Sequence, residues 1–314
     1  MRVYSGLAEV PAGTPAVLTI GFFDGPHRGH LAIIHRVRAL ANELRIAAGL
    51  VTFWPYPAVV LRPEEPVRLL ATLDEKLDLL RTLGELDFVV VMPFTTALAG
   101  LGPDAYLGQL RERITLRGLV EGADFRFGRD RAGDVAWLRR AGAAAGFVVE
   151  ALEVEAGGER ISSTRVRSLV AAGAVAEAAD LLGRPYTLAG TVIHGDARGR
   201  TLGFPTANLR LDPIRLLPGN GIYAVRAGLP GEPVAARPSV ASVGVRPTIA
   251  EGGARLVEVH LLDADLDLYG QRLEAAFVAW LRDERRFPDL ETLTARMKVD
   301  AAEARALLGS EESG

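Results

Sequence analysis

Cysteine is absent from the 314-residue chain, and this absence excludes several kinds of chemistry at once. Without thiols the protein cannot form disulfides, bind a metal through thiolates or use a cysteine nucleophile. A chain that has no disulfides also suits a reducing cell interior. The protein is therefore expected to work without a thiol and in a reducing compartment.

An excess of positive charge is also missing. The chain has 36 lysine and arginine residues against 39 aspartate and glutamate residues, which gives a formal net charge of -3. This balance provides no overall basic field that would hold a nucleic-acid backbone, and no basic patch is interleaved with aromatic residues. We expect no nucleic-acid partner, although local sites can still bind small anionic substrates.

Long hydrophobic runs are lacking too. The most apolar run, residues 88–101, is interrupted by Pro93, Thr95 and Thr96 and is shorter than the roughly 18 apolar residues of a membrane span. The N-terminal segment MRVYSGLAEV has no apolar core of the kind found in a secretory signal. We therefore expect a cytoplasmic protein without a membrane partner.

What is present indicates two folded domains. Hydrophobic residues make up 49% of the chain and charged residues 24%, as in ordinary globular proteins. A length of 314 residues exceeds the usual size of one domain, about 100–200 residues. The sequence contains no internal repeat, and it leaves the oligomeric state open, a homo-oligomer included.

In the first half of the chain, short apolar runs alternate with helical patterns. This alternation predicts a parallel, Rossmann-like sheet built from right-handed crossovers, with ligands at the carboxyl ends of its strands. One helical pattern, residues 74–84, ends on Gly84 as helices often do. The expected strands are residues 17–22, 49–53, 86–92, 116–122 and 146–152.

The hydrophobic pattern of the sequence changes after Gly183. Short runs rich in β-branched residues, separated by glycine and proline, predict an antiparallel β-barrel. Residues 289–309 return to a helical period, with one apolar stripe. The stripe comprises Leu290, Leu293, Met297, Ala301, Ala304 and Leu308. We therefore expect two domains, residues 1–184 and 185–314, the second closed by a C-terminal helix.

The segment GFFDGPHRGH (residues 21–30) lies where the first strand is expected to end and the first helix to begin. Gly21, Gly25 and Gly29 let the backbone approach a phosphate closely. The helix N-terminus behind them offers N–H groups and the positive end of a dipole. The segment therefore predicts an anion-binding loop.

Two histidines in this loop, His27 and His30, are three residues apart. At a helix start they share one face and can both donate hydrogen bonds to phosphate oxygens as charge builds there. The alternative is a glycine-rich turn with two surface histidines, which a bare HxxH pattern would favour. The preceding strand and the glycines favour the phosphate site.

A second segment that carries chemistry is ISSTRVR (residues 161–167). Its hydroxyl residues can cap a helix, and its arginines can extend toward a nucleotide. Taken alone, the segment is only a good helix start. The residues concerned are Ser162, Ser163, Thr164, Arg165 and Arg167.

Together these two segments resemble the nucleotidyltransferase family whose hallmarks are an HxGH loop and a later SSTxxR helix start. GADFRFGRDRAGD (residues 122–134) resembles the intervening stretch of the flavin-adenylylating branch. The resemblance implies that His27, His30 and Arg165 act at the transferred phosphate. It implies substrate-binding roles for Gly21, Phe23, Asp24, Gly25, Gly29, Asp124, Ser162, Ser163, Thr164 and Arg167. For Asp124, a solvated loop carboxylate is the alternative.

The implied reaction joins FMN to the AMP part of ATP. Its nucleophile, the FMN phosphate, is already anionic near neutral pH, because its second pKa is about 6. No base is needed, only alignment of the two phosphates and neutralisation of the departing pyrophosphate by the histidines, the arginines, the helix dipole and Mg²⁺.

The segment TFWPYP (residues 52–57) departs from this family. An acidic residue is typical where Trp54 stands, and histidine is frequent where Tyr56 stands. One interpretation is an adenylyltransferase module that is impaired or inactive. The other is that the aromatic pair packs against a flavin or adenine ring.

GTVIHGDARGRTLGFPTANL (residues 190–209) closely resembles the riboflavin kinase signature. Gly195, Gly199 and Gly203 give a flexible flap whose amides can wrap a triphosphate. The hydroxyl of Thr206 and the carbonyl oxygen of Asn208 are hard ligands that suit Mg²⁺ already bound to ATP. The alternative is a strand, a turn and a strand with a capping threonine and asparagine.

RLVEVHLLDADLDLYGQRL (residues 255–273) supplies the other half of that signature. In an alternating strand, Glu258 and His260 point to one face. The resemblance implies that Glu258 takes the proton from the riboflavin 5′-hydroxyl before it attacks the γ-phosphate of ATP, since an alcohol does need a base. His260 is interpreted as structural, and Arg282 is the candidate arginine beside the flavin.

The resulting hypothesis is a two-step enzyme of the bifunctional riboflavin kinase/FMN adenylyltransferase family. Riboflavin and ATP would give FMN and ADP, and FMN with a second ATP would give FAD and pyrophosphate. One alternative is a riboflavin kinase with an impaired adenylyltransferase module. Another is a carrier that binds flavin without turnover, which would have no use for a base beside a metal site.

Overall fold

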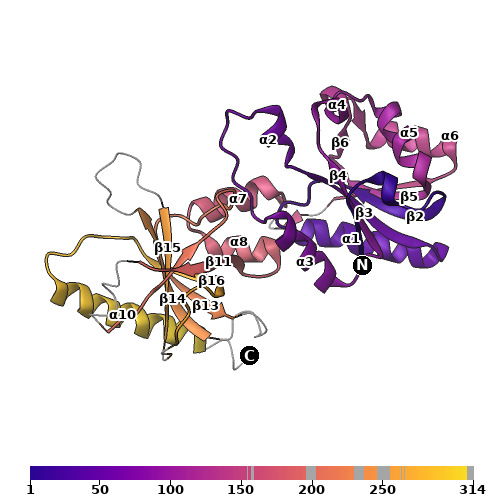
Figure 1. The fold of residues 1–314 in the computed structure, drawn as a ribbon. Helices are drawn as coiled ribbons and strands as arrows, with labels where there is room; N and C mark the ends of the chain where they lie inside the picture. Colours follow the sequence, from indigo (N-terminus) through magenta and orange to yellow (C-terminus); the bar gives the residue numbers. More distant parts are fainter. Residues whose placement is uncertain are drawn as a thin grey trace. The chain divides into compact units, whose positions relative to one another are not determined.

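The structure is a computed structural model, and it describes residues 1–153, 155–156, 159–195, 203–229, 237–245, 255–262, 264 and 266–309. The chain divides into two compact units, residues 1–163 and 164–314, which Figure 1 shows as a ribbon. The division at residue 163 comes earlier in the chain than the expected domain boundary at residue 184, which stays a prediction.

The first unit is built on a six-stranded sheet in which every neighbouring pair of strands is parallel, as expected. The strand order is β1-β4-β3-β2-β5-β8, so the chain adds strands to one side of β2 and then to the other. Ligands of such sheets bind beside this change of direction, at the carboxyl ends of the strands. The strands are β1 (Arg2–Tyr4), β2 (Thr14–Ile20), β3 (Ala47–Trp54), β4 (Phe88–Pro93), β5 (Ile114–Gly122) and β8 (Val148–Leu152).

Helices cover both faces of this sheet (Figure 1). Successive strand residues point to opposite faces, so Val17 packs with α1 and α3 whereas Leu18 packs with α5 and α6. The helices are α1 (Arg28–Leu44), α2 (Pro57–Leu61), α3 (Leu73–Leu83), α4 (Thr96–Ala99), α5 (Pro103–Arg113) and α6 (Val135–Ala145). Gly84 ends α3 with a φ of 72°, which confirms its expected role.

Short elements complete this unit. Two-residue strands form two small antiparallel pairs apart from the main sheet. They are β6 (Arg126–Phe127) with β7 (Gly133–Asp134), and β9 (Glu155–Ala156) with β10 (Glu159–Arg160). The single turns η1 (Leu7–Glu9) and η2 (Arg129–Arg131) are 3-10 helices.

The second unit contains a closed antiparallel barrel of six strands, as expected. Around the barrel the order is β11-β12-β15-β14-β13-β16. Its fully buried side chains include Leu188, Tyr223 and Phe277. The strands are β11 (Tyr186–Ile193), β12 (Ala207–Arg210), β13 (Gly221–Gly228), β14 (Arg237–Val245), β15 (Arg255–Leu261) and β16 (Arg272–Arg282).

Among the described residues, helices α7 (Ser163–Ala171), α8 (Val175–Leu182) and α10 (Leu290–Gly309) belong with this barrel. Ala301, Ala304 and Leu308 of α10 pack on buried barrel residues, as the predicted stripe requires. The stripe was wrong at its first member, because Leu290 begins the helix and is 65% exposed. Apolar periodicity therefore located the packed half of α10 but not where contact with the barrel begins.

Candidate active sites

The loop after β2 leads directly into helix α1. His27 is the N-cap of this helix, and its ring Nδ1 accepts a hydrogen bond of 3.2 Å from the backbone N–H of His30. A neutral His27 then carries its proton on Nε2, which is the nitrogen able to donate to a ligand. The helix begins at Arg28, so both histidines of the HxGH motif lie at its N-terminus.

The two histidine rings lie against each other. Their centroids are 3.7 Å apart with an angle of 12° between the planes, and the ring of Phe23 lies 4.5 Å from that of His30. His27 is only 4% exposed. Gly29 lies between the two histidines, and a Cβ there would be 3.1 Å from Nδ1 of His27. The structure thus brings together the imidazoles that the sequence singled out.

The backbone before the histidines is held by several elements of the unit. The N–H of Gly21 donates to the carbonyl of Val51 at 3.0 Å, which ties the loop to β3. The carbonyl of Phe22 accepts two hydrogen bonds, from the hydroxyl of Thr52 at 3.1 Å and from Nζ of Lys76 at 3.0 Å. Neither Thr52 nor Lys76 is predictable from the sequence as part of this loop, because these contacts join segments that are far apart in the chain.

Asp24 and Gly25 form the turn of the loop. The Asp24 carboxylate is 6% exposed and accepts from the N–H of Leu70 at 2.9 Å, while the Asp24 carbonyl accepts from the hydroxyl of Ser163 at 2.9 Å. Gly25 has a φ of 55°, and a Cβ on it would lie 2.5 Å from Cβ of Leu70. Asp24 and Ser163 therefore help to build the loop, whatever they contact in a substrate.

A buried carboxylate lies at the carboxyl end of β5. Glu121 is 2% exposed and accepts from the N–H of Ile20 at 2.9 Å and from the hydroxyl of Thr19 at 3.5 Å. Burial raises the pKa of Glu121 well above its usual range. Burial and the neighbouring Glu121 also raise the pKa of Tyr106. A carboxylate in the apolar second half of a parallel strand, after Gly118, was the sequence signal for this residue.

The helix-start segment lies at the beginning of α7. Ser162 and Ser163 are half-buried and Thr164 is exposed. The guanidinium of Arg167 donates to the hydroxyl of Thr164 at 3.1 Å, and Arg165 lies between them on the helix. The expected helix start is therefore present, and the nucleotide-binding roles of its residues stay predictions.

Asp124 follows β5 and forms an ion pair with Arg160, a residue that sequence analysis did not single out. Both side chains are at least half exposed. An exposed pair of this kind contributes little to stability, so a ligand can displace one partner at low cost. The predicted role of Asp124 toward flavin or metal stays a prediction.

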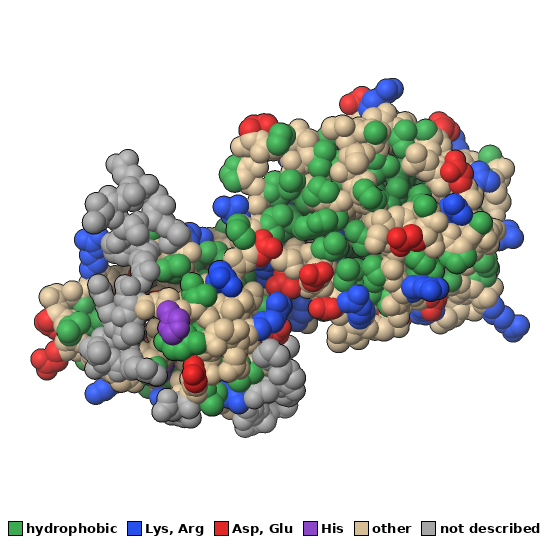
Figure 2. Space-filling model, in the orientation of Figure 1, with side chains coloured by type: hydrophobic (Ala, Val, Ile, Leu, Met, Phe, Trp, Pro, Cys, Tyr) green, Lys and Arg blue, Asp and Glu red, His purple; other side chains and the backbone are tan. Residues whose placement is uncertain are grey.

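Aromatic side chains gather at the carboxyl ends of β3 and β4. The ring of Phe22 lies 5.3 Å from Phe53 and 5.4 Å from Tyr56, and Phe94 packs on both Phe22 and Phe53. Phe22 is 36% exposed, and Trp54 and Tyr56 are half-buried. Figure 2 shows many hydrophobic side chains on the visible face of this unit. The two residues that depart from the family pattern thus adjoin a partly exposed aromatic surface.

In the second unit, Glu258 lies in the middle of β15 with Asn208 as its partner on β12 and Ser242 as its partner on β14. Val257 and Val259, on either side of it, are buried at 1% and 0% exposure. The expected alternation is confirmed, because the valines fill the barrel while Glu258 is half-buried. The two candidate residues therefore lie side by side across two hydrogen-bonded strands.

Gly195, the first glycine of the predicted flap, packs against the side chain of Asn208. A Cβ on Gly195 would lie 2.3 Å from the side-chain nitrogen of Asn208, which is 8% exposed. Only glycine allows this approach. Gly203, at the other end of the segment, has a φ of 80°, and Gly199 lies outside the described residues.

Thr206 is presented by a turn that His260 helps to hold. A ring nitrogen of His260, Nδ1, lies 2.7 Å from the carbonyl oxygen of Pro205, and the ring packs on Phe204 at 5.2 Å. His260 shares a strand face with Glu258, yet its contacts are with the protein. They agree with the interpretation of His260 as structural.

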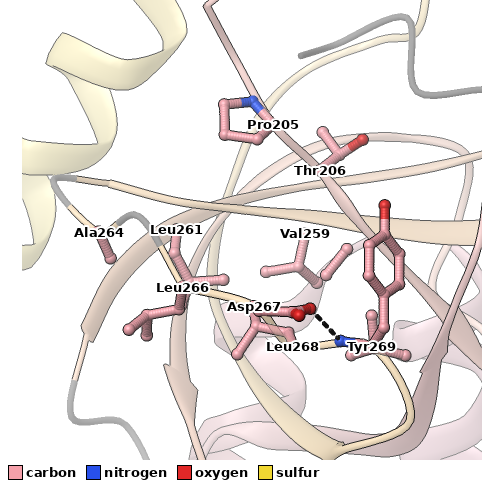
Figure 3. Close-up of a pocket in the computed structure, with 11 residues that line it drawn as sticks. Pro205, Thr206, Val259, Leu261, Ala264, Leu266, Asp267, Leu268 and Tyr269 are labelled. Atoms are coloured by element: carbon pink, nitrogen blue, oxygen red, sulfur yellow. Dashed lines mark hydrogen bonds between the residues drawn. The ribbon is translucent and has the colours of Figure 1, made fainter.

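A pocket opens beside Thr206 (Figure 3). Pro205 and Thr206 lie on one side of it, and Leu266, Asp267 and Leu268 lie on the other. The carboxylate of Asp267 accepts from the N–H of Tyr269 at 3.2 Å. Most of the lining side chains are apolar, although polar atoms also reach the surface of the pocket. The lining residues are Val192, Pro205, Thr206, Ala207, Val259, Leu261, Ala264, Leu266, Asp267, Leu268 and Tyr269.

Arg282, the candidate arginine beside the flavin, ends β16 and binds the buried carboxylate of Asp300 on α10. Its Nη2 lies 2.7 Å and its Nε 2.9 Å from the two carboxylate oxygens. Arg296 donates to the same carboxylate at 2.8 Å. This network ties the last strand to α10, so the residue has a structural contact whatever its role toward flavin.

Among the described residues, no group of three or more histidine, cysteine, aspartate or glutamate side chains could hold a metal ion by itself. Over the same part of the chain, no helix has the length and hydropathy needed to cross a membrane.

Comparison with known proteins agrees with this two-part organisation. The FAD synthetase family model matches residues 10–165, and the riboflavin kinase family model matches residues 182–308. The bifunctional riboflavin kinase/FMN adenylyltransferase of Pseudomonas fluorescens is 41% identical over 98% of each chain. That of Escherichia coli K12 is 38% identical over 98% of this chain and 97% of its own.

A solved structure shows the same fold. A crystal structure from Streptococcus pneumoniae, described as a macrolide-efflux protein, matches with a TM-score of 0.86 and 27% identity. The match covers 96% of this chain and 98% of that one. With both family models matched in order and relatives similar along nearly the whole length, the chain belongs to the bifunctional riboflavin kinase/FMN adenylyltransferase family.

Proposed function

We propose that residues 185–314 phosphorylate riboflavin to FMN and that residues 1–184 adenylylate FMN to FAD. The observation that carries this division is the different chemistry of the two sites. A strand pair in the barrel presents a glutamate beside an asparagine, whereas the loop of the first unit presents two stacked histidines at a helix N-terminus.

For the kinase step, Glu258 accepts the proton of the riboflavin 5′-hydroxyl as this oxygen attacks the γ-phosphate of ATP. The neighbouring position of Asn208 supports this role, since it places a base next to a residue suited to the phosphate end of ATP. The amides near Gly195 and Gly203 wrap the triphosphate.

The donor set beside Glu258 fits Mg²⁺. Thr206 offers a hydroxyl oxygen and the buried Asn208 an amide oxygen, and both are hard ligands. Mg²⁺ bound to few protein groups usually takes its other ligands from water and substrate phosphates. When bound there, the ion would neutralise charge on the transferred phosphate, and Thr206 and Asn208 would hold it.

The pocket beside Thr206 suits the adenine ring of ATP. Its walls are mainly aliphatic with Tyr269 at one side, as a planar uncharged ring requires. Val259 lines the pocket, whereas the adjacent Glu258 points to the opposite face of β15. Riboflavin, whose hydroxyl must reach Glu258, therefore binds elsewhere, where Arg282 is our candidate contact.

For the adenylyl step, Nε2 of His27 and the ring of His30 donate to the phosphates of ATP at the α1 N-terminus. Asp24, Gly25 and Gly29 shape the loop around these phosphates. Arg165 and Arg167 neutralise the departing pyrophosphate. The remaining predicted contacts to nucleotide or flavin are Gly21, Phe23, Asp124, Ser162, Ser163 and Thr164.

The small molecules ATP, riboflavin and FMN are the partners that this function requires. We propose that the protein meets them in the cytoplasm and binds no nucleic acid. The net charge of -3 and the lack of cysteine support both statements.

The experiment that tests the proposed function is a time course with purified protein, riboflavin, ATP and Mg²⁺, with flavins separated by liquid chromatography. FMN should appear first and FAD should follow. FMN that accumulates without FAD would restrict the function to the kinase, and the absence of both products would favour a flavin carrier.

A further inference from the structure

Lys76 occupies an unusual position for a lysine. It lies near the start of α3 and is only 5% exposed, although lysine is among the residues least often buried. It is also one of only two lysines among the 36 basic residues of the chain, the other being the exposed Lys298. In a chain whose basic residues are nearly all arginine, the residue beneath the loop after β2 is a lysine. Its ammonium group is compact and has three donors.

The ammonium group of Lys76 joins three segments of the first unit. Nζ donates to the carbonyl of Phe22 at 3.0 Å and to the hydroxyl of Thr52 at 2.9 Å. The hydroxyl of Thr52 donates to the same carbonyl at 3.1 Å. These contacts form a closed triangle between the loop, β3 and α3, centred on the carbonyl of the Phe22–Phe23 peptide.

The electrostatic surroundings show that this position is costly for a charge. Burial lowers the pKa of Lys76 to about 8, and the negative charge of Asp24 opposes that shift. Asp24 belongs to the same loop and is itself fixed by the N–H of Leu70. The ammonium group thus interacts with two residues of this loop: it donates a hydrogen bond to the carbonyl of Phe22, and the negative charge of Asp24 stabilises its positive charge.

We propose that Lys76 is the positioning residue of the adenylyltransferase loop: by fixing the Phe22 carbonyl against β3, it sets the path of residues 23–27 and so the placement of His27. This inference rests on the proposed function of the loop. It adds a residue that does not touch the reacting atoms, lies about fifty residues away in the sequence and acts through backbone geometry.

Because Lys76 acts on the loop, its loss should lower the rate of the chemical step more than the binding of ATP. A misplacement of about 1 Å at a reacting centre can cost about 100-fold in rate. We expect Lys76→Met to lower kcat for FMN adenylylation by about 10- to 100-fold and to change the KM for ATP less than about threefold.

The experiment compares Lys76→Met, Lys76→Gln and the matched control Lys298→Met, each assayed separately for FMN adenylylation and for riboflavin phosphorylation. Lys76→Gln keeps a donor for the Phe22 carbonyl and should recover part of the lost kcat. Lys298→Met should match the wild type in both assays. In Lys76→Met, amide hydrogen exchange should be faster than in the wild type for peptides that cover residues 21–27. Peptides of α5 should exchange at the wild-type rate.

Several results would overturn this inference. They are an unchanged kcat in Lys76→Met, a lower kcat without faster exchange in the loop, or a rise in KM alone. If Lys76→Met loses both activities through unfolding, Thr52→Val decides, because it removes another donor to Phe22 and keeps the side-chain shape. It should lower FAD synthesis in the same direction, and an unchanged rate would contradict the proposal. A wild-type protein that makes no FAD would refute the proposed function instead.

Discussion

The two units differ in the contacts that their acidic side chains make near the proposed phosphate-binding segments. In the first unit, Asp24 accepts from a backbone N–H, Asp124 pairs with an arginine, and Glu121 is buried against the end of β2. Asp24 and Glu121 are buried and help to build the site, whereas the exposed Asp124 can exchange its arginine partner for a ligand. In the barrel, Glu258 is half-buried beside Asn208 on the strand face opposite the buried valines, and it is the proposed base for the substrate hydroxyl.

This difference follows from the two nucleophiles. A phosphate is ionised near neutral pH, so a site that activates it needs alignment and positive charge but no base. An alcohol must lose its proton as it attacks, so its site needs a base within hydrogen-bond reach. The protonation state of the nucleophile thus explains the contrast. One unit relies on the geometry of its loop, and the other relies on a glutamate that acts as a base.

The largest effect is expected from removing that glutamate. Glu258→Gln keeps the size of the side chain and abolishes its basicity, so riboflavin phosphorylation should fall by about 10²- to 10⁴-fold. FMN adenylylation, measured with added FMN, should stay at the wild-type rate. Flavin products separated by chromatography report both activities.

Glu274→Gln is the matched control for this change. Glu274 is another half-buried glutamate of the barrel, on β16, where its carboxylate lies 3.7 Å from Arg272. The control should keep both activities. Equal loss of both activities in Glu258→Gln, or a kinase that survives the change, would remove the proposed contrast between the units.

The reverse pattern is expected when the histidines of the first unit are replaced. His27→Ala with His30→Ala removes two donors at the α1 N-terminus, and one such donor can be worth about 10²- to 10³-fold in rate. FAD synthesis should fall by at least about 10²-fold while riboflavin phosphorylation is spared. Intact FAD synthesis would refute the assignment.

Two further variants separate chemistry from helix capping. His35→Ala alters an exposed histidine of the same helix, 3.3 Å from Glu85, and should leave both activities unchanged. His27→Asn keeps an N-cap acceptor but not the imidazole. If His27→Asn retained full FAD synthesis, the role of His27 would be capping alone.

The sequence was sufficient for features that depend on local pattern. Apolar runs located five of the strands in the main sheet, and the spacing of His27 and His30 placed both rings at one helix start. Strand β1 was missed because its three residues, of which one is arginine, are too few to form an apolar run.

Features that depend on contacts between distant segments could not be predicted. Nothing near Lys76 shows that its ammonium group meets Phe22 and Thr52, because packing alone brings α3 beneath the loop. The pairing of Arg160 with Asp124 likewise requires the fold. Local pattern therefore proposes candidate groups for substrate contact, while the groups packed around them emerge only from tertiary structure.

The smallest effect concerns the stability of the first unit, and it tests how tightly its loop is built. Gly25→Ala adds a Cβ at a φ of 55°, where it would lie 2.5 Å from Cβ of Leu70. A left-handed backbone costs a non-glycine residue about 1–2 kcal/mol, and the clash adds to that cost. The free energy of unfolding of this unit should therefore fall by at least about 2 kcal/mol.

Gly84→Ala provides the matched control, because Gly84 has a φ of 72° but no atom within 4 Å of its added Cβ. Its free energy of unfolding should fall only by the cost of the left-handed backbone, about 1–2 kcal/mol. In a Trp280→Phe background, urea unfolding followed by the fluorescence of Trp54 and Trp137 reports on the first unit alone. Equal losses for the two glycine variants would mean that Leu70 yields easily, and that the loop is held by its hydrogen bonds rather than by packing around Gly25.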